Sequence, residues 1–298
     1  MRFVKGHGTE NDFVLLPDLP EAELSADLVR ALCDRHAGLG ADGVLRVGRD
    51  GGGWFMDYRN ADGSVAEMCG NGVRVFARYL VDAGLATPGT LTVGSRGGPK
   101  RVTVPATGDV TVDMGEPVLL AGTREVLGIK AVAVSMGNPH VVVPLGSVAE
   151  LDALDLSSPP RVIPPLPGGQ NVEFVVRTGR HLRMRVHERG VGETRSCGTG
   201  VCAAVVAAVH GSAGHGGAGH GAGHEGAGHG SAGHGHAGQG THGAGDAAGP
   251  DGRGVPWTVD VPGGRLSVTW SDTVTLTGPA VLVASGEVLL QGQRLQIG

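Results

Sequence analysis

The sequence predicts a mixed α/β (α+β) chain, rich in strands, that is built from two similar halves with strands wrapped around one helix in each. Three observations support this prediction: a repeated cysteine element, strand-like runs between glycines and prolines, and a helical pattern behind each repeated cysteine. The repeat consists of residues 69–73 (CGNGV) and 197–201 (CGTGV), which lie 128 residues apart.

The similarity between the halves extends beyond this element. Asn11 aligns with Asn138 at a shift of 127, and residues 58–72 align with residues 186–200 at a shift of 128. Near-constant spacing of this kind indicates a duplicated domain. A chain of 298 residues accommodates two domains of ordinary size.

Strands are predicted wherever Val, Leu and Thr alternate between turn residues. Such runs occupy residues 13–16, 89–94, 101–105, 132–135 and 141–144. Near the end of the chain, residues 257–261 and 266–270 flank a Pro-Gly-Gly-Arg turn and predict a hairpin.

Two helices are predicted to begin at the repeated cysteines. After Cys69, apolar residues recur at helical spacing until Gly84, with Arg74, Arg78 and Asp82 on the other side. This pattern predicts a helix with one buried face. After Cys197, residues 201–209 are apolar on every side, which predicts a helix enclosed by sheet.

Residues 211–254 form a Gly/Ala/His tract without hydrophobic periodicity, and it interrupts the connection between the second helix and the hairpin. Ordering a glycine-rich backbone costs about 1–2 kcal/mol per residue, and this tract has almost no large side chains to offset that cost. We expect a disordered surface loop that is a neutral expansion. In the alternative hypothesis, these histidines make the protein a metal buffer.

The composition favours a small-molecule partner. A net charge of −5 and only three lysines argue against binding to nucleic acid or to a membrane surface. The first residues have no apolar run suited to a signal peptide and no later segment resembles a membrane span, so we expect a cytoplasmic protein. Cysteines in such a chain serve catalysis or burial rather than disulfides. Cys33 and Cys202 lack the glycine context and are predicted to be inert core residues.

The repeated cysteines suit proton transfer. A thiol at a helix N-terminus meets free backbone N–H groups and the positive end of the helix dipole, so we expect its pKa to be lowered. The glycines that follow let the same N–H groups approach a carboxylate. If the two elements face each other, a thiolate and a thiol bracket one carbon atom, which is the arrangement for two-base inversion of a stereocentre.

Several motifs in this sequence closely resemble those of the diaminopimelate epimerase family. Apart from the His-rich tract, the resemblance covers nearly the whole chain, in family order. The motifs are residues 11–13 (NDF), 60–63 (NADG), 69–72 (CGNG), 137–140 (GNPH), 170–172 (QNV), 188–194 (ERGVGET) and 197–200 (CGTG).

The resemblance implies interconversion of LL- and meso-diaminopimelate, a step of lysine and peptidoglycan precursor synthesis, without pyridoxal phosphate, another cofactor or a metal. It also implies two pseudo-symmetric domains, each a β-barrel-like sheet around a central helix, with the active site in the cleft between them. By this analogy the domains span residues 1–115 plus 285–298 and residues 116–284. A cytoplasmic homodimer without nucleic-acid or membrane partners is the implied form.

The resemblance also assigns roles to individual residues. Cys69 and Cys197 would be the acid/base pair, and His140 and Glu188 would assist them. The residues that would bind the substrate are Asn11, Asn60, Gly70, Asn71, Asn138, Asn171, Glu188, Arg189, Gly198 and Thr199. Arg189 suits a distal carboxylate because its fork donates two parallel hydrogen bonds.

The chain departs from the family at two positions. It has Glu10 where the family commonly has Gly, and Gly43 near a position where the family often has Gln. We expect the Glu10 side chain to point into solvent.

The alternative within the enzyme class is a proline or hydroxyproline racemase, which also uses two cysteines. In that family a His typically follows the first Cys-Gly, where this chain has Asn71. That family also lacks the adjacent Glu188 and Arg189. A substrate screen separates the two readings.

Overall fold

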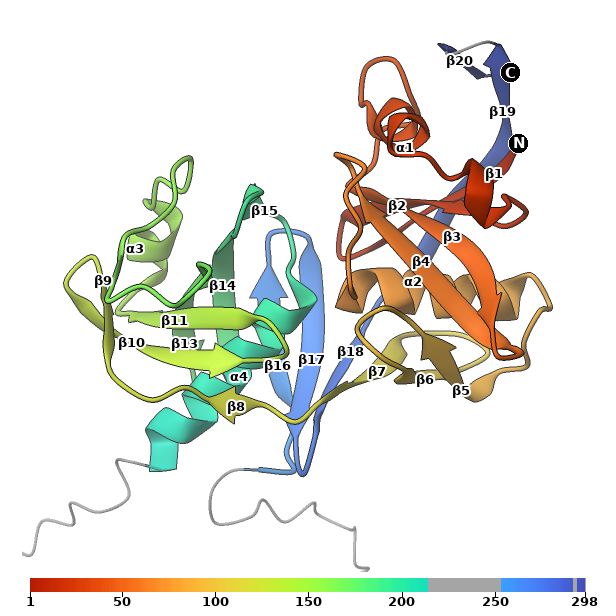
Figure 1. The fold of residues 1–298 in the computed structure, drawn as a ribbon. Helices are drawn as coiled ribbons and strands as arrows, with labels where there is room; N and C mark the ends of the chain where they lie inside the picture. Colours follow the sequence, from red (N-terminus) through yellow and green to blue (C-terminus); the bar gives the residue numbers. More distant parts are fainter. Residues whose placement is uncertain (214–252, 292–293, 298) are drawn as a thin grey trace, which may run out of the picture.

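The computed structural model describes residues 1–213, 253–291 and 294–297. Two halves lie side by side, and each wraps its strands around a long helix (Figure 1). The His-rich tract between residues 214 and 252, and with it the expectation of a disordered loop, lies outside the described residues.

In the first half, eight strands follow the order β19-β1-β2-β3-β4-β5-β6-β7. Neighbours are antiparallel except β2 with β3 and β4 with β5, which are parallel. The strands are β1 (Arg2–Gly8), β2 (Asn11–Leu16), β3 (Gly43–Asp50), β4 (Gly53–Asn60), β5 (Gly89–Gly94), β6 (Lys100–Val104), β7 (Val110–Gly115) and β19 (Val281–Gln291). Helix α2 (Gly70–Asp82) connects β4 to β5.

The second half repeats this order and these directions as β8-β10-β11-β13-β14-β16-β17-β18. Here β11 with β13 and β14 with β16 are the parallel pairs, and helix α4 (Gly198–Ala213) lies between β14 and β16 in sequence. The strands are β8 (Val118–Leu119), β10 (Ile129–Ser135), β11 (Pro139–Leu145), β13 (Asn171–Thr178), β14 (His181–Glu188), β16 (Trp257–Val261), β17 (Gly264–Trp270) and β18 (Val274–Gly278). The matching topology confirms the predicted fold class and the duplication behind it.

Smaller elements decorate this frame. In the first half they are the 3-10 helix η1 (Glu21–Glu23) and helix α1 (Ala26–Cys33), and β20 (Arg294–Ile297) pairs with the end of β19. In the second half they are β9 (Arg124–Val126), α3 (Val148–Asp152), β12 (Val162–Ile163) and β15 (Gly192–Thr194). The predicted strands and the predicted hairpin of β16 and β17 are all present.

One strand pairing and one crossing of the chain join the halves. Strand β7 pairs with β18 antiparallel, which makes the sheet continuous from one half to the other. Strand β19 leaves the second half and pairs with β1 from Val281 to Glu287, so the last long strand lies in the first half. Figure 1 shows this strand running up beside β1.

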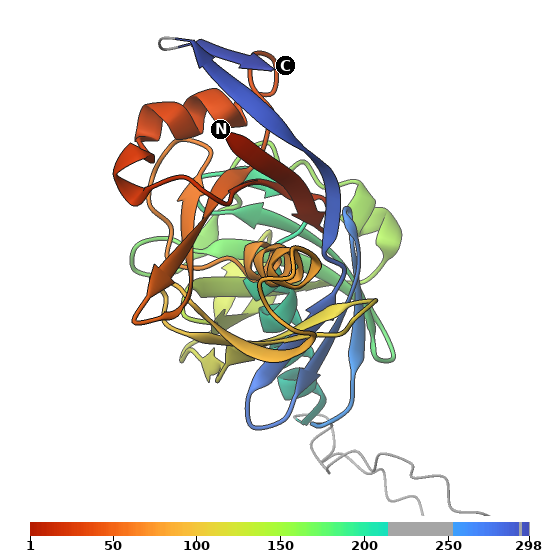
Figure 2. The ribbon, with the colours of Figure 1, turned by 90° about the vertical axis from the view of Figure 1, so that its right-hand side faces the viewer.

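Both long helices are enclosed by strands, although the pattern of apolar residues predicted burial on every side only for α4. Helix α4 is apolar and buried on every side from Val201 to Ala207, as predicted. Helix α2 was predicted to expose Arg74 and Arg78, but these side chains are only 0% and 6% exposed. The prediction was wrong because the strands encircle α2, as the end-on view in Figure 2 shows, and backbone carbonyls accept from both guanidinium groups.

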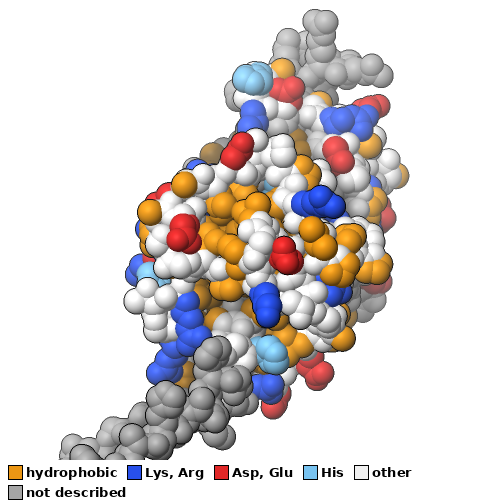
Figure 3. Space-filling view, turned by 90° about the vertical axis from the view of Figure 1, so that its left-hand side faces the viewer, with side chains coloured by type: hydrophobic (Ala, Val, Ile, Leu, Met, Phe, Trp, Pro, Cys, Tyr) orange, Lys and Arg blue, Asp and Glu red, His pale blue; other side chains and the backbone are white. Residues whose placement is uncertain are grey.

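The outer face of the second half carries hydrophobic side chains between scattered charges (Figure 3). Exposed apolar residues of this half include Val118, Leu127 and Ile163. No helix within the described residues is long and apolar enough to cross a membrane.

Candidate active site

The starts of α2 and α4 touch each other. A Cβ atom added to Gly198 would lie 3.3 Å from the Cα atom of Gly70 and 3.5 Å from the backbone N of Asn71. In both helices the first intrahelical bond returns to the cysteine, from Val73 N to the Cys69 carbonyl and from Val201 N to the Cys197 carbonyl, each at 2.9 Å. Glycine at this contact brings the two sets of free N–H groups together.

Cys69 caps α2 with its sulfur. Its Sγ accepts from the backbone N–H of Gly72 at 3.4 Å and donates to Oδ1 of Asn11 at 3.5 Å. The predicted lowering of its pKa was wrong: burial raises the pKa of Cys69 to about 11, although the hydrogen bonds from Gly72 and Asn71 act in the opposite direction. Removing the thiolate from water outweighs the helix terminus.

Cys197 is buried more deeply, with 6% of its surface exposed. Burial, followed by the nearby charges of Glu188 and Glu173, raises the pKa of Cys197 well above its ordinary value. The Thr199 hydroxyl, whose Oγ1 lies 3.5 Å from the sulfur, and the Gly200 N–H favour the thiolate but do not reverse the shift. Here too the predicted lowering was wrong, for the same reason.

The other two cysteines fit the prediction of core residues. Cys33 is 5% exposed and Cys202 is 0% exposed. Burial raises the pKa of each to about 12. Both thiols are therefore protonated at neutral pH.

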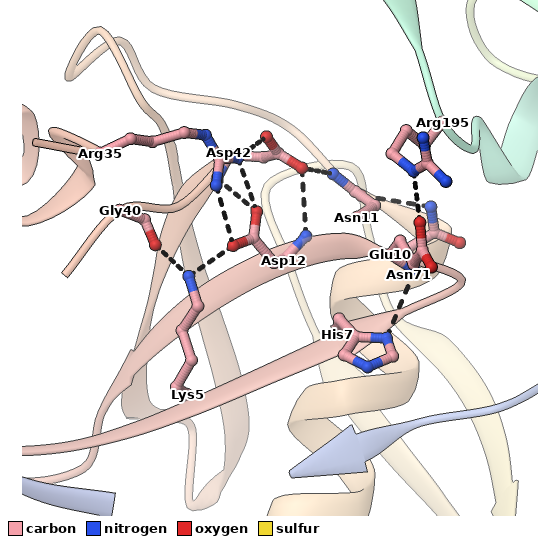
Figure 4. A network of polar contacts seen from close by, with 10 residues as sticks. All are labelled: Lys5, His7, Glu10, Asn11, Asp12, Arg35, Gly40, Asp42, Asn71 and Arg195. Carbon is pink, nitrogen blue, oxygen red and sulfur yellow. Dashed lines mark hydrogen bonds and ion pairs between the residues drawn. The ribbon is translucent and has the colours of Figure 1, made fainter. Parts of the chain in front are cut away.

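An acidic network orients Asn11 (Figure 4). The Nδ2 group of Asn11 donates to Oδ2 of Asp42 at 2.8 Å, which turns Oδ1 toward Cys69 and toward Nδ2 of Asn71 at 3.2 Å. The Nη2 group of Arg35 donates to Oδ1 of Asp42 at 2.6 Å and to Oδ1 of Asp12 at 2.9 Å, so it links the two carboxylates. Burial alone would raise the pKa of Asp12, but hydrogen bonds from Arg35 and Lys5 outweigh it and lower the pKa to about 2.

A second network lies beside Cys197. The ring of His140 places Nδ1 2.7 Å from Oε1 of Glu173 and Nε2 3.0 Å from Oδ1 of Asn138. The Asn138 amide donates to Oγ1 of Thr199 at 3.3 Å. Asn171 lies opposite His140 in the strand register, and its Nδ2 is 3.5 Å from Nδ1 of the ring.

Glu173 is a member of this site that the sequence reasoning missed. It is 0% exposed, and its Oε2 has no hydrogen-bond partner among the described residues. A signal was present, because a single acidic residue interrupts an apolar strand directly after the Gln-Asn-Val motif. A Cβ atom on Gly200 would lie 2.6 Å from Oε1 of Glu173, so glycine at this position leaves room for the carboxylate.

Glu188 and Arg189 lie at the end of β14. The hydroxyl of Thr194 donates to Oε1 of Glu188 at 2.5 Å. Burial raises the pKa of Glu188, opposed by hydrogen bonds from Thr194 and Cys197. The backbone N–H of Arg189 donates to Oδ1 of Asn171 at 2.9 Å, and its guanidinium donates to the carbonyl of Gly168 at 2.9 Å.

Asn60 is tied to its own loop, where its Nδ2 donates to the Ser64 hydroxyl at 3.0 Å. It pairs with Gly43 in the register of β3 and β4. A side chain does not fit at Gly43 in this arrangement, because a Cβ atom would lie 2.5 Å from the Arg59 carbonyl oxygen and 2.7 Å from the Tyr58 ring.

We expect from the sequence that Glu10 points into solvent, but its side chain has a partner in the structure. Its carboxylate forms an ion pair with Arg195 of the second half. Its backbone φ of 60° lies in the left-handed region, which explains why glycine suits this turn. Next to it, the Thr9 hydroxyl lies 2.6 Å from that of Ser196, a buried bond between the halves that the sequence did not suggest.

A cavity of about 550 Å³ opens between the halves at this point. In the first half its lining comes from residues at and beside the turn between β1 and β2, among them Asn11, and from Arg35 and Asp42. In the second half it comes from residues around β15, among them Thr194 and Arg195. Of the predicted site residues, Asn11 lines this cavity, and a cysteine precedes the start of each enclosed helix. Within the described residues no group of three His, Cys, Asp or Glu side chains is arranged to hold a metal ion.

Comparison with known proteins agrees with this architecture. The family model for diaminopimelate epimerase matches residues 3–120 and 132–216. A diaminopimelate epimerase of Streptomyces coelicolor is 49% identical over 309 residues, which cover 96% of this chain and 94% of that protein. A diaminopimelate epimerase of Thermobifida fusca is 45% identical over 319 residues, which cover 99% of this chain and 100% of that protein.

Among solved structures, a PhzF-family phenazine biosynthesis protein of Bacillus anthracis superposes with a TM-score of 0.66 at 14% identity, covering 97% of this chain and 99% of that one. At this level of identity the likeness shows a shared fold. The sequence matches are far closer and extend over nearly the full length of each protein. The chain therefore belongs to the diaminopimelate epimerase family.

Proposed function

We propose that this protein is an isomerase that interconverts LL- and meso-diaminopimelate by a two-base mechanism, with Cys69 and Cys197 as the two bases. The observation that supports the proposal is the contact between the two helix starts, each of which is preceded by a cysteine whose carbonyl accepts the first helical hydrogen bond. Family membership and the relatives' names support the substrate.

In the proposed reaction one sulfur begins as a thiolate. It removes the α-proton of the substrate, so that one S–H bond forms and the C–H electron pair stays on carbon, delocalised into the adjacent carboxylate. The thiol on the opposite face then gives its proton to that carbon. The configuration is inverted and the thiolate has moved to the other sulfur. A raised thiol pKa suits this step, because the corresponding thiolate is a stronger base for a weakly acidic C–H bond.

The developing negative charge needs donors that are already in place. The N–H groups of Gly70, Asn71, Gly198 and Thr199 would bind the carboxylate at the reacting carbon, where the two helix termini favour an anion. Glu188 would accept the Cys197 proton when the thiolate forms. Its own raised pKa is consistent with that role.

The far end of diaminopimelate carries a second ammonium and a second carboxylate. Arg189 would bind the carboxylate, and Glu188 would accept from an ammonium. The side-chain amides of Asn11, Asn60, Asn138 and Asn171 would serve either sign, since an amide both donates and accepts. His140 would assist the thiol pair through Asn138.

A substrate screen in heavy water tests the function. Purified protein should introduce deuterium at the α-carbon of diaminopimelate and give the inverted isomer, with no exchange on L-proline or trans-4-hydroxy-L-proline. Exchange on the proline substrates alone would replace the proposal with the racemase reading. A solved probable proline racemase of Agrobacterium radiobacter gives that reading its structural basis, with a TM-score of 0.62 at 14% identity.

We further infer that the enzyme works as a homodimer in the cytoplasm, with domains of residues 1–115 plus 285–298 and 116–284. These proposals rest on the family resemblance. Sedimentation equilibrium would give twice the 30.1 kDa chain mass if the dimer is right, and one chain mass if it is wrong.

A further inference from the structure

We propose that Glu173 is a positioning residue for the Cys197 half of the site, acting through a hydrogen-bonded chain that runs from Glu173 through His140 and Asn138 to Thr199. The inference rests on the proposed function and deepens it. It concerns how one of the two thiols is kept in working geometry.

The chain is continuous in space. Each of its three links joins two different elements or turns, at 2.7 Å from Glu173 to His140, 3.0 Å from His140 to Asn138, and 3.3 Å from Asn138 to Thr199. The Thr199 hydroxyl then lies 3.5 Å from the sulfur of Cys197. Its members come from β13, β11, the turn before β11 and the first turn of α4.

The direction of the chain follows from what each group can donate. Because a carboxylate only accepts, Glu173 holds the ring nitrogen Nδ1 of His140 as a donor. The carbonyl oxygen of Asn138 also only accepts, so the other ring nitrogen, Nε2, donates to it, and the NH₂ group of Asn138 faces Thr199. The threonine hydroxyl accepts from this NH₂ group with one lone pair and directs its hydrogen toward Cys197. One buried carboxylate thereby fixes the orientation of a histidine ring, an amide and a hydroxyl.

The position is built for a carboxylate. Gly200 is the residue that makes room for it, since a Cβ atom there would lie 2.6 Å from Oε1. Oε2 is buried and has no partner among the described residues, so Glu173 carries an uncompensated desolvation cost. Burial of this kind weakens the fold, and a functional constraint accounts for its presence better than stability does.

The two halves differ at this point, although their topology matches. Residue 45, which corresponds to Glu173 at the shift of 128, is a leucine, and it is buried in the core. At Cys69, Asn11 instead presents its carbonyl oxygen to the sulfur and is oriented by Asp42. The positioning chain therefore acts on one thiol and leaves the other as an internal reference.

The ionisable groups around Cys197 determine whether its alkylation midpoint moves to lower or to higher pH. The charges that act on Cys197 are Glu188 on β14 and Glu173 on β13, and His140 on β11 lies beside Glu173. Helix α2 also contacts α4, and the charges of its N-cap residue Cys69 and of its Arg74 act on each other. Strands β10 and β17 also pack against α4, but their charged residues Lys130 and Arg265 are exposed, and β18 carries no charge. Glu173→Gln removes one negative charge from this group with almost no change of shape.

The experiment measures alkylation of each cysteine by iodoacetamide against pH, using peptide mass spectrometry, together with kcat and KM for diaminopimelate. In Glu173→Gln the alkylation midpoint of Cys197 should move to lower pH by about one unit, because a nearby negative charge is gone. Turnover should nevertheless fall about tenfold or more, with little change in KM, because the chain is no longer held in one orientation. The Cys69 profile should stay unchanged.

Thr199→Val breaks the last link without touching Glu173. It should also lower kcat, but it should move the Cys197 midpoint to higher pH, since the sulfur loses a donor. Thr199→Ser retains the hydroxyl and should restore the wild-type profile. These variants decide the matter if Glu173→Gln fails to fold.

Asp57→Asn is the matched control, because Asp57 is a carboxylate with the same 0% exposure in the first half. It should lower the melting temperature and leave both alkylation profiles in place. Wild-type kcat and an unmoved Cys197 profile in Glu173→Gln would overturn the inference, as would equal shifts at Cys69 and Cys197. If wild-type protein exchanges no α-proton, the proposed function fails instead, and the alkylation profiles still test the chain.

Discussion

At the scale of single residues, the chemistry of the two thiols depends on burial more than on sequence context. The Cys-Gly elements correctly predicted helix starts, and the sulfur of Cys69 does accept from the N–H of Gly72. The direction of the pKa shift was predicted wrongly, because a motif shows which donors are near a thiol but not how much water the fold removes. Glu173 was missed for a related reason: its importance depends on partners from other strands.

The buried thiol Cys202 gives a test of this point. Its pKa is about 12 in the folded protein, against an ordinary value of 9.0. Between these values the unfolded chain loses the proton and the folded chain keeps it, so the unfolding free energy falls as pH rises, by about 1.4 kcal/mol per pH unit for one thiol. Cys202→Ala should therefore lose less stability than wild type between pH 8 and 10.5 in urea titrations.

The substitution itself should cost about 1 kcal/mol at pH 8, because it leaves a small cavity in α4. Cys33→Ala is the companion variant, since the pKa of Cys33 is also about 12. Parallel stability curves for wild type and both variants across this pH range would contradict the raised pKa values.

At the scale of elements, hydrophobic periodicity located both helices but did not show that α2 is enclosed. A stripe of arginines normally marks a solvent face. Here Arg74 is satisfied internally by Oδ1 of Asn71 at 3.0 Å and by the carbonyls of Gly70 at 3.3 Å and Pro279 at 3.4 Å. The last of these acceptors is more than 200 positions away, so no local pattern could have predicted the contact.

Two arginines on the same helix separate stability from activity. Arg74→Lys and Arg78→Lys each replace a fork by a single ammonium and leave backbone carbonyls without a donor. Each should lower the unfolding free energy by about 1–3 kcal/mol. Only Arg74 holds Asn71 beside the thiol, whereas Arg78 binds the carbonyls of Pro105 and Gly108 at the far end.

Steady-state kinetics at a temperature where both variants are folded should therefore show a loss of kcat in Arg74→Lys alone. An equal loss in both variants would mean that the activity follows stability, and that Arg74 has no particular role at the site.

At the scale of the whole molecule, duplication was readable from the sequence and the way the halves meet was not. The constant shift between the cysteine elements predicted two similar halves, and the strand orders match. Contacts such as Glu10 with Arg195 and Thr9 with Ser196 cross between them. They depend on the packing of turns, for which spacing in the sequence gives no rule.

The His-rich tract is predicted to be dispensable for catalysis. Helix α4 ends at Ala213 and β16 begins at Trp257, so the tract enters between elements whose site residues lie at the opposite end of α4. Replacing residues 214–252 with a short Gly/Ser linker should leave kcat and KM within about twofold of wild type, the range of ordinary context effects. The metal-buffer alternative would be favoured if the wild-type protein has no epimerase activity but binds Ni²⁺ or Zn²⁺ tightly, and if the linker variant loses that metal binding.

The central claim is that one thiol works on each face of the same carbon. The most direct measurement follows deuterium incorporation and inversion for each stereoisomer of diaminopimelate in heavy water, with wild type, Cys69→Ala and Cys197→Ala in parallel. Wild type should give the inverted isomer with deuterium at the new configuration, and each variant should lose inversion by at least about a thousandfold. Inversion at the wild-type rate in either variant would contradict the account.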